Sequence, residues 1–143
     1  MAAHLALGDT AYDSVGPIVT ELVTLSQPQA SARDGALETE VTYIDSFGNL
    51  RLAGGRSQLE TAFTGLAEGD RLIVRVGSEQ LGSTVFARSF GHVDAGACIL
   101  YVDSSGDLAL ADNQSSLAAR IGAKSGDPVE IGEVATLPRS VSR

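Results

Sequence analysis

Apolar and β-branched residues occur along the chain in short runs, each bounded by glycine, aspartate or serine. Residues 43–52 contain an apolar strand, an Asp-Ser-x-Gly turn and a second short strand, and residues 101–110 repeat this order. Aspartate in such a turn accepts hydrogen bonds from backbone amides, and glycine supplies the residue with positive φ. Each copy therefore predicts a β-hairpin.

The repeat continues beyond the hairpins. A short helical segment follows each one, over 58–65 and 115–122, and a strand headed by Gly-Asp follows each helix, over 69–74 and 126–131. Short strands at such intervals are typical of barrels and sandwiches. The pattern predicts an all-β fold: an antiparallel, Greek-key-like β-barrel with an internal two-fold repeat and two or three short helices. We expect the repeat to bring the two hairpin turns to one rim.

The first 35 residues precede the repeat. Residues 1–8 are rich in helix formers and end in glycine, so they predict a helix, and the missing N-cap fits an artificial boundary or a split reading frame. Residues 15–25 predict an extended connector, and 26–35 predict a loop. We interpret 1–35 as a truncated helix and connector from an interdomain region, and 36–143 as the β-barrel domain.

Composition excludes several classes of function. With 43% hydrophobic residues, the 143-residue chain can form one packed domain. Its formal charge of −8 disfavours nucleic acid as a partner, because phosphate backbones are bound by basic patches. The apolar runs are too short to span a bilayer, and the N-terminus lacks a signal-peptide pattern. We expect a cytoplasmic protein that binds neither nucleic acid nor membrane.

Few residues offer catalytic chemistry. Cys98 lies in an apolar run, which predicts a buried structural thiol, and His4 and His92 lack metal ligands at suitable spacing. The chain has no Gly-x-Ser-x-Gly nucleophile elbow. Asp45 and Asp103 repeat at equivalent turn positions, which favours turn capping over acid–base catalysis. No catalytic residue, metal or cofactor is assigned.

The two turns nonetheless carry groups that suit a planar heterocycle. Phe47 offers an aromatic face, Asn49 offers an amide that both donates and accepts, and Ser104 and Ser105 offer hydroxyls. Hairpins of this composition also occur in β proteins that bind no ligand, so a purely structural interpretation stays open.

Residues 112–116 precede the second helical segment. Either Asn113 or Ser115 is expected to cap that helix. Free amides at the helix start would face the same rim.

Five segments resemble, in order and spacing, the C-terminal half of the SAM hydroxide adenosyltransferases, also described as SAM hydrolases, which are related to fluorinating and chlorinating enzymes. The similar segments are 2–8, 43–50, 104–108, 113–119 and 126–129. The resemblance implies a trimeric, two-domain enzyme. In it an N-terminal α/β domain holds S-adenosyl-L-methionine (SAM) and activates water, and the C-terminal β-domain of a neighbouring subunit closes over the adenine.

The resemblance also implies roles for single residues. Phe47 would stack near the adenine, Asn49 would hydrogen-bond its amino edge, and Ser104 would lie by the methionine end. The backbone at 113–114 would help to hold the base, and Phe90 would line the same pocket. The substrate-binding residues implied are Phe47, Asn49, Phe90, Ser104, Ser105, Asn113 and Gln114.

Two positions depart from the family pattern. After Asn49 the family often continues with a Thr-Asn pair, whereas Arg51 and the residues after it stand here. Asp112 replaces a residue that is usually apolar. The turn 104–106 resembles the water-using branch, because the halogenating branch tends to have arginine there.

The function implied is the adenine-side domain of a hydrolase that converts SAM and water to adenosine and L-methionine, with SAM as substrate and no cofactor. Without the N-terminal catalytic domain, the chain is expected to bind SAM weakly and not to turn it over. The alternative is a non-catalytic nucleoside-binding or protein-assembly β-barrel module.

Overall fold

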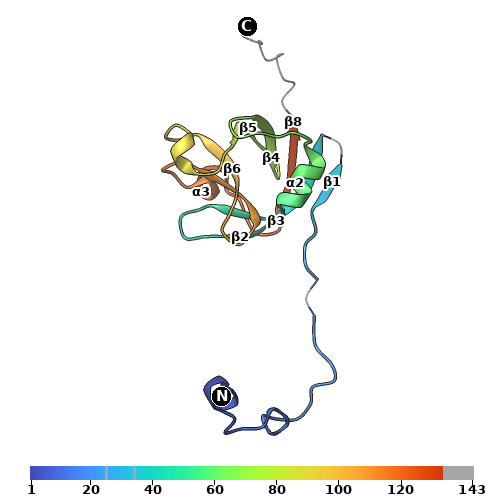
Figure 1. The fold of residues 1–143 in the computed structure, drawn as a ribbon. Coiled ribbons are helices and arrows are strands. Elements are labelled where there is room, and N and C mark those ends of the chain that lie inside the picture. The colour runs from blue at the N-terminus through green and yellow to red at the C-terminus, as the bar shows by residue number, and fades with distance from the viewer. Residues whose placement is uncertain (25, 34, 134–143) are drawn as a thin grey trace.

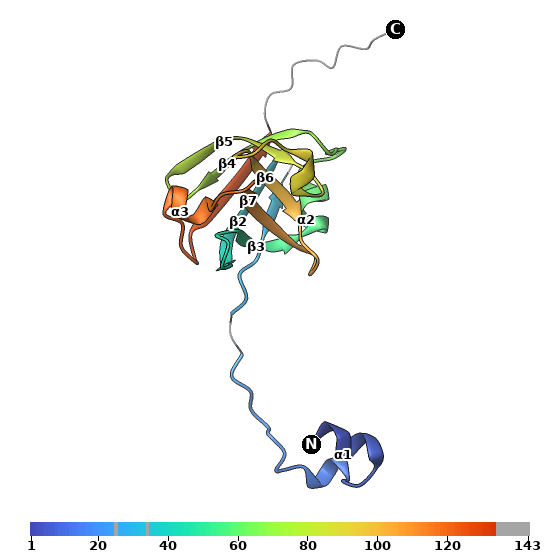
Figure 2. The same ribbon diagram turned by 90° about the vertical axis from the view of Figure 1, so that its left-hand side faces the viewer.

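The computed structural model describes residues 1–24, 26–33 and 35–133. Helix α1 (Ala2–Leu7) and the 3₁₀ helix η1 (Tyr12–Ser14) lie at the far end of an extended arm that leaves the barrel (Figures 1 and 2). The helix ends as predicted at Gly8, whose φ is 76°. The connector is extended and pairs with no strand over its described part. Residue 25 of the connector and residues 134–143 of the predicted domain lie outside the described residues.

Both copies of the sequence repeat fold as predicted, into a hairpin, a helix and a strand. The first copy comprises β2 (Ala36–Ile44), β3 (Leu50–Gly55), α2 (Arg56–Ala62) and β4 (Arg71–Val76). The second comprises β6 (Cys98–Val102), β7 (Asp107–Asp112), α3 (Leu117–Ile121) and β8 (Pro128–Glu133).

Four elements outside the repeat were not predicted, and one of them is η1 in the arm. Strand β5 (Glu79–Phe86) and the 3₁₀ helix η2 (Phe90–His92) lie between the two copies. Strand β1 (Ser31–Arg33) falls within the predicted loop 26–35, so that prediction is wrong in part. The backbone of β1 pairs with Ala36, Leu37 and Glu38 of β2, and this ladder gives the segment its strand conformation.

Seven strands close into a barrel in the order β2-β3-β7-β6-β5-β4-β8, with β8 pairing back onto β2. All neighbouring strands are antiparallel except β5 and β6, which are parallel over two residue pairs. The prediction of an all-β barrel is confirmed. No helix in the described part of the chain is long and apolar enough to cross a membrane.

The barrel interior is filled by apolar side chains. Alternate residues of β4 point inward, so Leu72 and Val74 are buried while Ile73 is exposed. Helix α2 adds Leu59 to the core, and α3 adds Leu117. Each fully buried side chain of this size contributes about 1.5–3 kcal/mol relative to leaving it exposed.

The sequence repeat appears in the sheet as a two-fold relation. Equivalent strands β3 and β7 are antiparallel neighbours, with Arg51 opposite its counterpart Ala109. Equivalent strands β4 and β8 are antiparallel neighbours too, with Val74 opposite its counterpart Ile131. Counterparts that face each other in two separate strand pairs indicate a two-fold axis through both. Strand β5 breaks this symmetry, because it separates β6 from β4 whereas β2 contacts β8 directly.

The two hairpin turns lie at opposite ends of the β3–β7 pair, so the expectation that they share one rim is wrong. Leu50, which follows the first turn, pairs with Leu110 near the end of β7. Gly55, at the far end of β3, pairs with Asp107 directly after the second turn. The physical reason is that two-fold-related neighbours in an antiparallel pair run in opposite directions, which sends their starting turns apart.

Candidate functional site

Asp45 organises the turn between β2 and β3. Its Oδ1 accepts hydrogen bonds from the backbone N–H groups of Phe47 and Asn49, both at 2.9 Å, and its Oδ2 accepts one from Asn49 Nδ2 at 2.8 Å. Desolvation raises the pKa of Asp45, but the hydrogen bonds from Asn49 and Phe47 outweigh it and the net shift is downward. The predicted capping role of Asp45 is confirmed.

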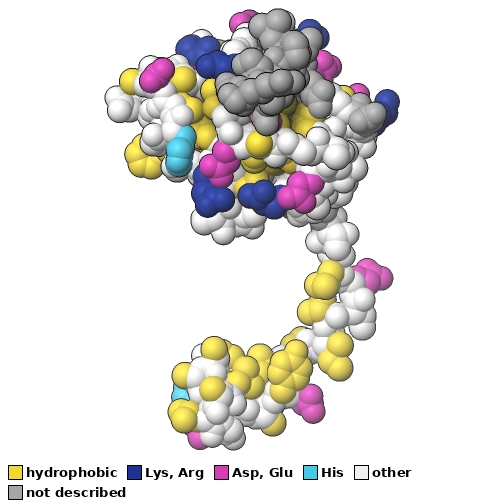
Figure 3. Space-filling model, turned by 45° about the horizontal axis from the view of Figure 1, so that its top comes forward, with side chains coloured by type: hydrophobic (Ala, Val, Ile, Leu, Met, Phe, Trp, Pro, Cys, Tyr) yellow, Lys and Arg dark blue, Asp and Glu magenta, His cyan; other side chains and the backbone are white. Residues whose placement is uncertain are grey.

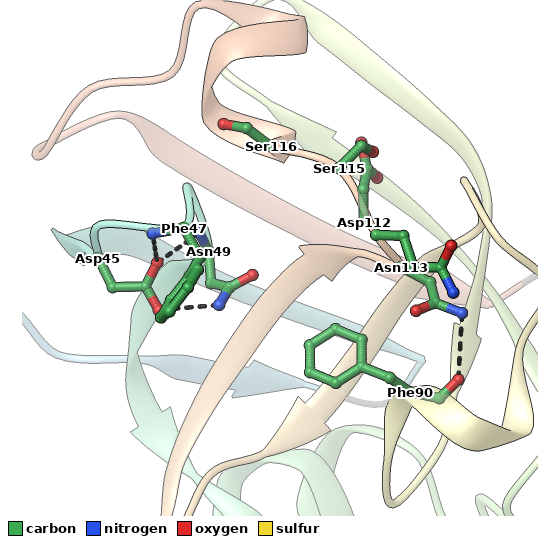
Figure 4. A pocket seen from close by; sticks show the side chains of 9 residues that line it. Asp45, Phe47, Asn49, Phe90, Asp112, Asn113, Ser115 and Ser116 are labelled. Atoms are coloured by element: carbon green, nitrogen blue, oxygen red, sulfur yellow. Dashed lines mark hydrogen bonds between the residues drawn. The ribbon is translucent and has the colours of Figure 1, made fainter.

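This turn fixes the side-chain amide of Asn49 in one orientation. A carboxylate only accepts hydrogen bonds, so Asn49 must turn its NH₂ group toward Asp45 and its carbonyl oxygen away from it. Figure 4 shows that oxygen directed into the space between the turn and Asn113. Asn49 therefore presents an acceptor to whatever occupies that space.

The space is a pocket of about 840 Å³ formed by three segments. They are the β2–β3 turn, η2 with the Phe90 ring, and the loop that joins β7 to α3 (Figure 4). The lining residues are Asp45, Phe47, Asn49, Phe90, Asp112, Asn113, Gln114, Ser115 and Ser116. Phe47 is 77% exposed, so a broad aromatic surface stands open at the pocket's edge.

A second departure from two-fold symmetry, a loop between β7 and α3, explains why this pocket forms at the first turn. Strand β3 runs directly into α2, whereas residues 113–116 separate β7 from α3. Ser116 of that loop and the start of α3 lie against the first turn: a Cβ on Gly48 would collide with Ser116, and Ala118 N–H of α3 donates to the Gly48 carbonyl at 3.0 Å. Glycine is required at position 48 for this contact as well as for its φ of 84°.

Asn113 holds the loop against η2. Its Nδ2 donates to the carbonyls of Phe90 at 3.3 Å and Val93 at 2.8 Å, and its backbone N–H donates to Ala97 at 2.9 Å. The side chain of Asn113 thus positions Phe90 and does not cap α3.

The helix cap is Ser116, whose Oγ accepts from Ala119 N–H at 3.1 Å. The expectation that Asn113 or Ser115 caps α3 is therefore wrong. The helix begins later than its sequence suggests, because Gln114 leaves the helical region with a φ of 63°.

Gln114 is the only non-glycine residue with positive φ in the described part of the chain. Its backbone N–H makes no hydrogen bond to another described residue. Such conformations cost about 1–3 kcal/mol and concentrate at ligand sites, where the fold holds them in place. Gln114 lines the pocket, so its backbone N–H is a candidate donor to a ligand there.

Asp112 lines the pocket and carries a paired charge. Arg120 donates to its two carboxylate oxygens, from Nε at 2.6 Å and from a terminal nitrogen at 2.9 Å. The Asp112 side chain is 1% exposed, whereas that of Arg120 is 47% exposed. The pair ties α3 to the end of β7, and the acid that departs from the family pattern is neutralised from within the domain.

Residues 39–130 match the family of the SAM hydroxide adenosyltransferase C-terminal domain. The chain belongs to this family. A (R)-S-adenosyl-L-methionine hydrolase of Salinispora tropica is 33% identical over 133 residues, which cover 92% of this chain and 46% of that protein. The Thermus thermophilus hydrolase of the same name is 34% identical, covering 91% of this chain and 44% of that protein.

Two solved structures are similar to this chain and, like the hydrolases, are matched over about half of their length. An uncharacterized conserved protein from Thermotoga maritima superposes with a TM-score of 0.75 at 28% identity, covering 92% of this chain and 49% of that one. A conserved hypothetical protein from Thermus thermophilus gives a TM-score of 0.59 at 32% identity, covering 91% of this chain and 48% of that one. The chain spans about half the length of the relatives it matches.

Five of the residues implied by resemblance to this family line the pocket, namely Phe47, Asn49, Phe90, Asn113 and Gln114. The other two, Ser104 and Ser105, lie on the turn at the opposite end of the β3–β7 pair and do not line it. Sequence reasoning did not assign Asp45, Asp112, Ser115 or Ser116 to ligand contact. A signal for Asp112 was present, because an acid that ends the apolar run 108–111 needs a partner when buried.

Arg51, the other residue that departs from the family pattern, forms ion pairs with two acids of this domain. It lies 3.0 Å from Asp103 and 3.7 Å from Asp107, and its side chain is 43% exposed. Exposed pairs of this kind contribute about 0–1 kcal/mol. Arg51 therefore joins β3 to the second turn without reaching the pocket lining.

Cys98 is buried, as predicted, and burial raises the pKa of its thiol to about 11. The described residues contain no group of three or more His, Cys, Asp or Glu side chains placed to hold a metal ion.

Proposed function

We propose that this domain supplies the adenine side of a site that converts SAM and water to adenosine and L-methionine. The observation that carries the proposal is the fixed amide of Asn49, whose oxygen faces the pocket beside the exposed Phe47 ring. A carbonyl acceptor suits the 6-amino group of adenine, and an aromatic face suits its ring. The hydrolase names of the two relatives supply the reaction.

The remaining groups of the pocket fit the same ligand. Phe90 supplies a second apolar wall, and the N–H of Gln114 supplies a donor for a ring nitrogen. Ser104 keeps its proposed role at the methionine end, and Ser105 stays a proposed substrate-binding residue on the same turn. SAM is longer than adenine, and their turn lies beyond the pocket along the β3–β7 pair.

Water activation is assigned to a different part of the assembly. The pocket's two acids are already engaged: Asp45 holds the turn and Asp112 binds Arg120. In this proposal the groups that position water for attack at C5′ belong to the half of the family proteins that this chain does not match. The site then lies between that half and this domain, within a trimer.

A turnover assay tests the proposal. The chain is mixed with the part of the S. tropica hydrolase that it does not match, and adenosine release from SAM is followed by chromatography. The mixture is expected to release adenosine, and Asn49→Ala should lower kcat/KM about tenfold or more through loss of one buried hydrogen bond. Gln80→Ala, an exposed amide on β5, is the control and should leave the rate unchanged. Equal rates for both variants, or no adenosine from the mixture, contradict the proposal.

A further inference from the structure

The ring of Phe90 is one wall of the Asn49 pocket, but it stands on a short element. It projects from η2, a 3₁₀ helix of three residues, toward the first turn (Figure 4). This helix lies at the surface, where Figure 3 shows the histidine of the barrel, which belongs to η2, in cyan beside apolar side chains. Phe90 is itself 36% exposed. A ring in such a place keeps one position only if other side chains hold it.

The backbone of η2 is fixed by Asn113. The Asn113 amide donates to the carbonyls of Phe90 and Val93, and Val93 N–H donates to the Phe90 carbonyl at 3.2 Å. None of these bonds involves the ring, so they place the backbone of Phe90 without selecting its χ1 rotamer. A further contact has to set the direction of the ring.

The ring of Tyr101 makes that contact. The centroids of the Phe90 and Tyr101 rings are 5.6 Å apart, and the two ring planes are inclined by 58°. Aromatic pairs favour such tilted arrangements, in which the edge of one ring approaches the face of the other. Tyr101 lies on β6 and packs with Ile99 and Ala111 in a small cluster separate from the main core. The contact therefore ties the pocket wall to the sheet of the barrel.

The sheet in turn holds Tyr101. Tyr101 is opposite Ala109 of β7, and Ala109 is opposite Arg51 of β3, so the three side chains form one row on the same face of the sheet. Ala109 is only 3% exposed, because its larger neighbours in this row cover its small side chain. Asp103 binds Arg51 at 3.0 Å. Tyr101 thus belongs to a row with a fixed neighbour.

The ring of Tyr101 makes this contact without help from a charge on its oxygen. Burial, and then the carboxylates of Asp45 and Asp103, raise the pKa of Tyr101, so the phenol stays neutral at physiological pH. Phenylalanine at position 101 would make the same ring contact.

We propose that Tyr101 is a positioning residue of the adenine site, whose ring holds the Phe90 ring in place as a pocket wall. The inference rests on the proposed function, because it takes the occupant of the pocket to be adenine. It deepens that function by assigning part of the affinity to a residue outside the pocket lining.

Two NMR measurements on the isotope-labelled chain test the proposal. Without ligand, the Phe90 ring protons should carry a ring-current shift in wild type and in Tyr101→Phe, and Tyr101→Leu should lose it. In titrations with adenosine, Tyr101→Leu should weaken binding about three- to tenfold, as expected for loss of one aromatic contact, and Tyr101→Phe should bind as wild type does.

A double-mutant cycle shows whether Tyr101 acts through Phe90. Phe90→Leu should weaken adenosine binding by at least as much as Tyr101→Leu does. In the Phe90→Leu background, Tyr101→Leu should then cause no further loss, because the contact is already gone.

Tyr43→Leu is the matched control. Tyr43 is the counterpart of Tyr101 in the sequence repeat and lies in the same row, opposite Arg51, but within the described residues it makes no ring contact. This variant should bind adenosine within about twofold of wild type, as expected for an exposed position.

The inference is overturned if the Phe90 ring signals are unchanged in Tyr101→Leu, if Tyr43→Leu or Tyr101→Phe weakens binding as much as Tyr101→Leu, or if the losses at positions 90 and 101 add. Failure of wild type to bind adenosine overturns the proposed function instead. The ring signals of Phe90 then still decide whether Tyr101 positions that ring, because they are recorded without ligand.

Discussion

Replacing Arg120 with alanine should destabilise the domain more than replacing its partner Asp112. In Arg120→Ala the carboxylate of Asp112, 1% exposed, loses both of its hydrogen bonds from the guanidinium. Removing one member of a buried ion pair costs about 3–5 kcal/mol. Because the Arg120 end is 47% exposed, water reaches part of the vacated space, and we expect about 2–4 kcal/mol.

The reverse variant, Asp112→Ala, leaves a half-exposed guanidinium that water can solvate, so about 1–2 kcal/mol is expected. The double variant should be no less stable than Arg120→Ala, because the unpaired carboxylate is then gone. Both costs are large beside the roughly 5–15 kcal/mol that stabilises a typical domain.

Urea unfolding followed by far-UV circular dichroism measures these differences, with the m-value as a check on two-state behaviour. The control is Arg75→Ala, because Arg75 lies 3.5 Å from Glu130 with both side chains more than half exposed. That control should change the free energy of unfolding by less than about 0.5 kcal/mol. If Arg120→Ala costs no more than Arg75→Ala, the pair does not hold α3 to β7 and this account of the ion pair fails.

Three further predictions concern the same end of the barrel. Gly48→Ala should cost at least about 1 kcal/mol more than Gly106→Ala in urea unfolding. Both glycines have positive φ, but a Cβ at 48 meets Ser116 whereas a Cβ at 106 meets nothing within 4 Å; equal costs would remove the steric argument. Asp45→Asn should be less stable than wild type at neutral pH. Because folding lowers the pKa of Asp45, this difference should be lost as the pH falls through the folded pKa, below the unfolded value of 3.8, and a difference that persists in acid would contradict the charge argument. Cys98, with a pKa raised to about 11 mainly by burial, should resist a disulfide reagent at about pH 8 in the folded protein and react fully in urea, so prompt reaction of the folded protein would show that the thiol is accessible.

The hairpins and helices of the repeat could be predicted because their signals are local. An Asp-x-x-Gly turn encodes its own hydrogen bonds, and both Asp45 and Asp103 make them. Strand β5 escaped prediction because its first residues, from Glu79 to Ser83, are mostly polar and exposed, so they show no alternation between buried and exposed positions.

The arrangement of the two turns was predicted wrongly because a repeat in sequence does not specify its symmetry operation. A two-fold axis through an antiparallel pair separates equivalent turns, and the pairing of Arg51 with Ala109 identifies that axis. The pairing of Asp112 with Arg120 was equally out of reach, since it depends on where the turn at Gln114 sends α3.

The central claim, that the Asn49 pocket binds adenine by its amino edge, is tested most directly by NMR titration of the ¹⁵N-labelled chain with adenosine and with inosine. We predict that adenosine shifts the amide signals of Phe47, Asn49 and Gln114, and that Asn49→Ala removes this response. Inosine should bind at least about fivefold more weakly, because its 6-oxo group would face the carbonyl of Asn49, acceptor against acceptor. Equal responses to both nucleosides, or unmoved pocket amides at saturating adenosine, would contradict the claim.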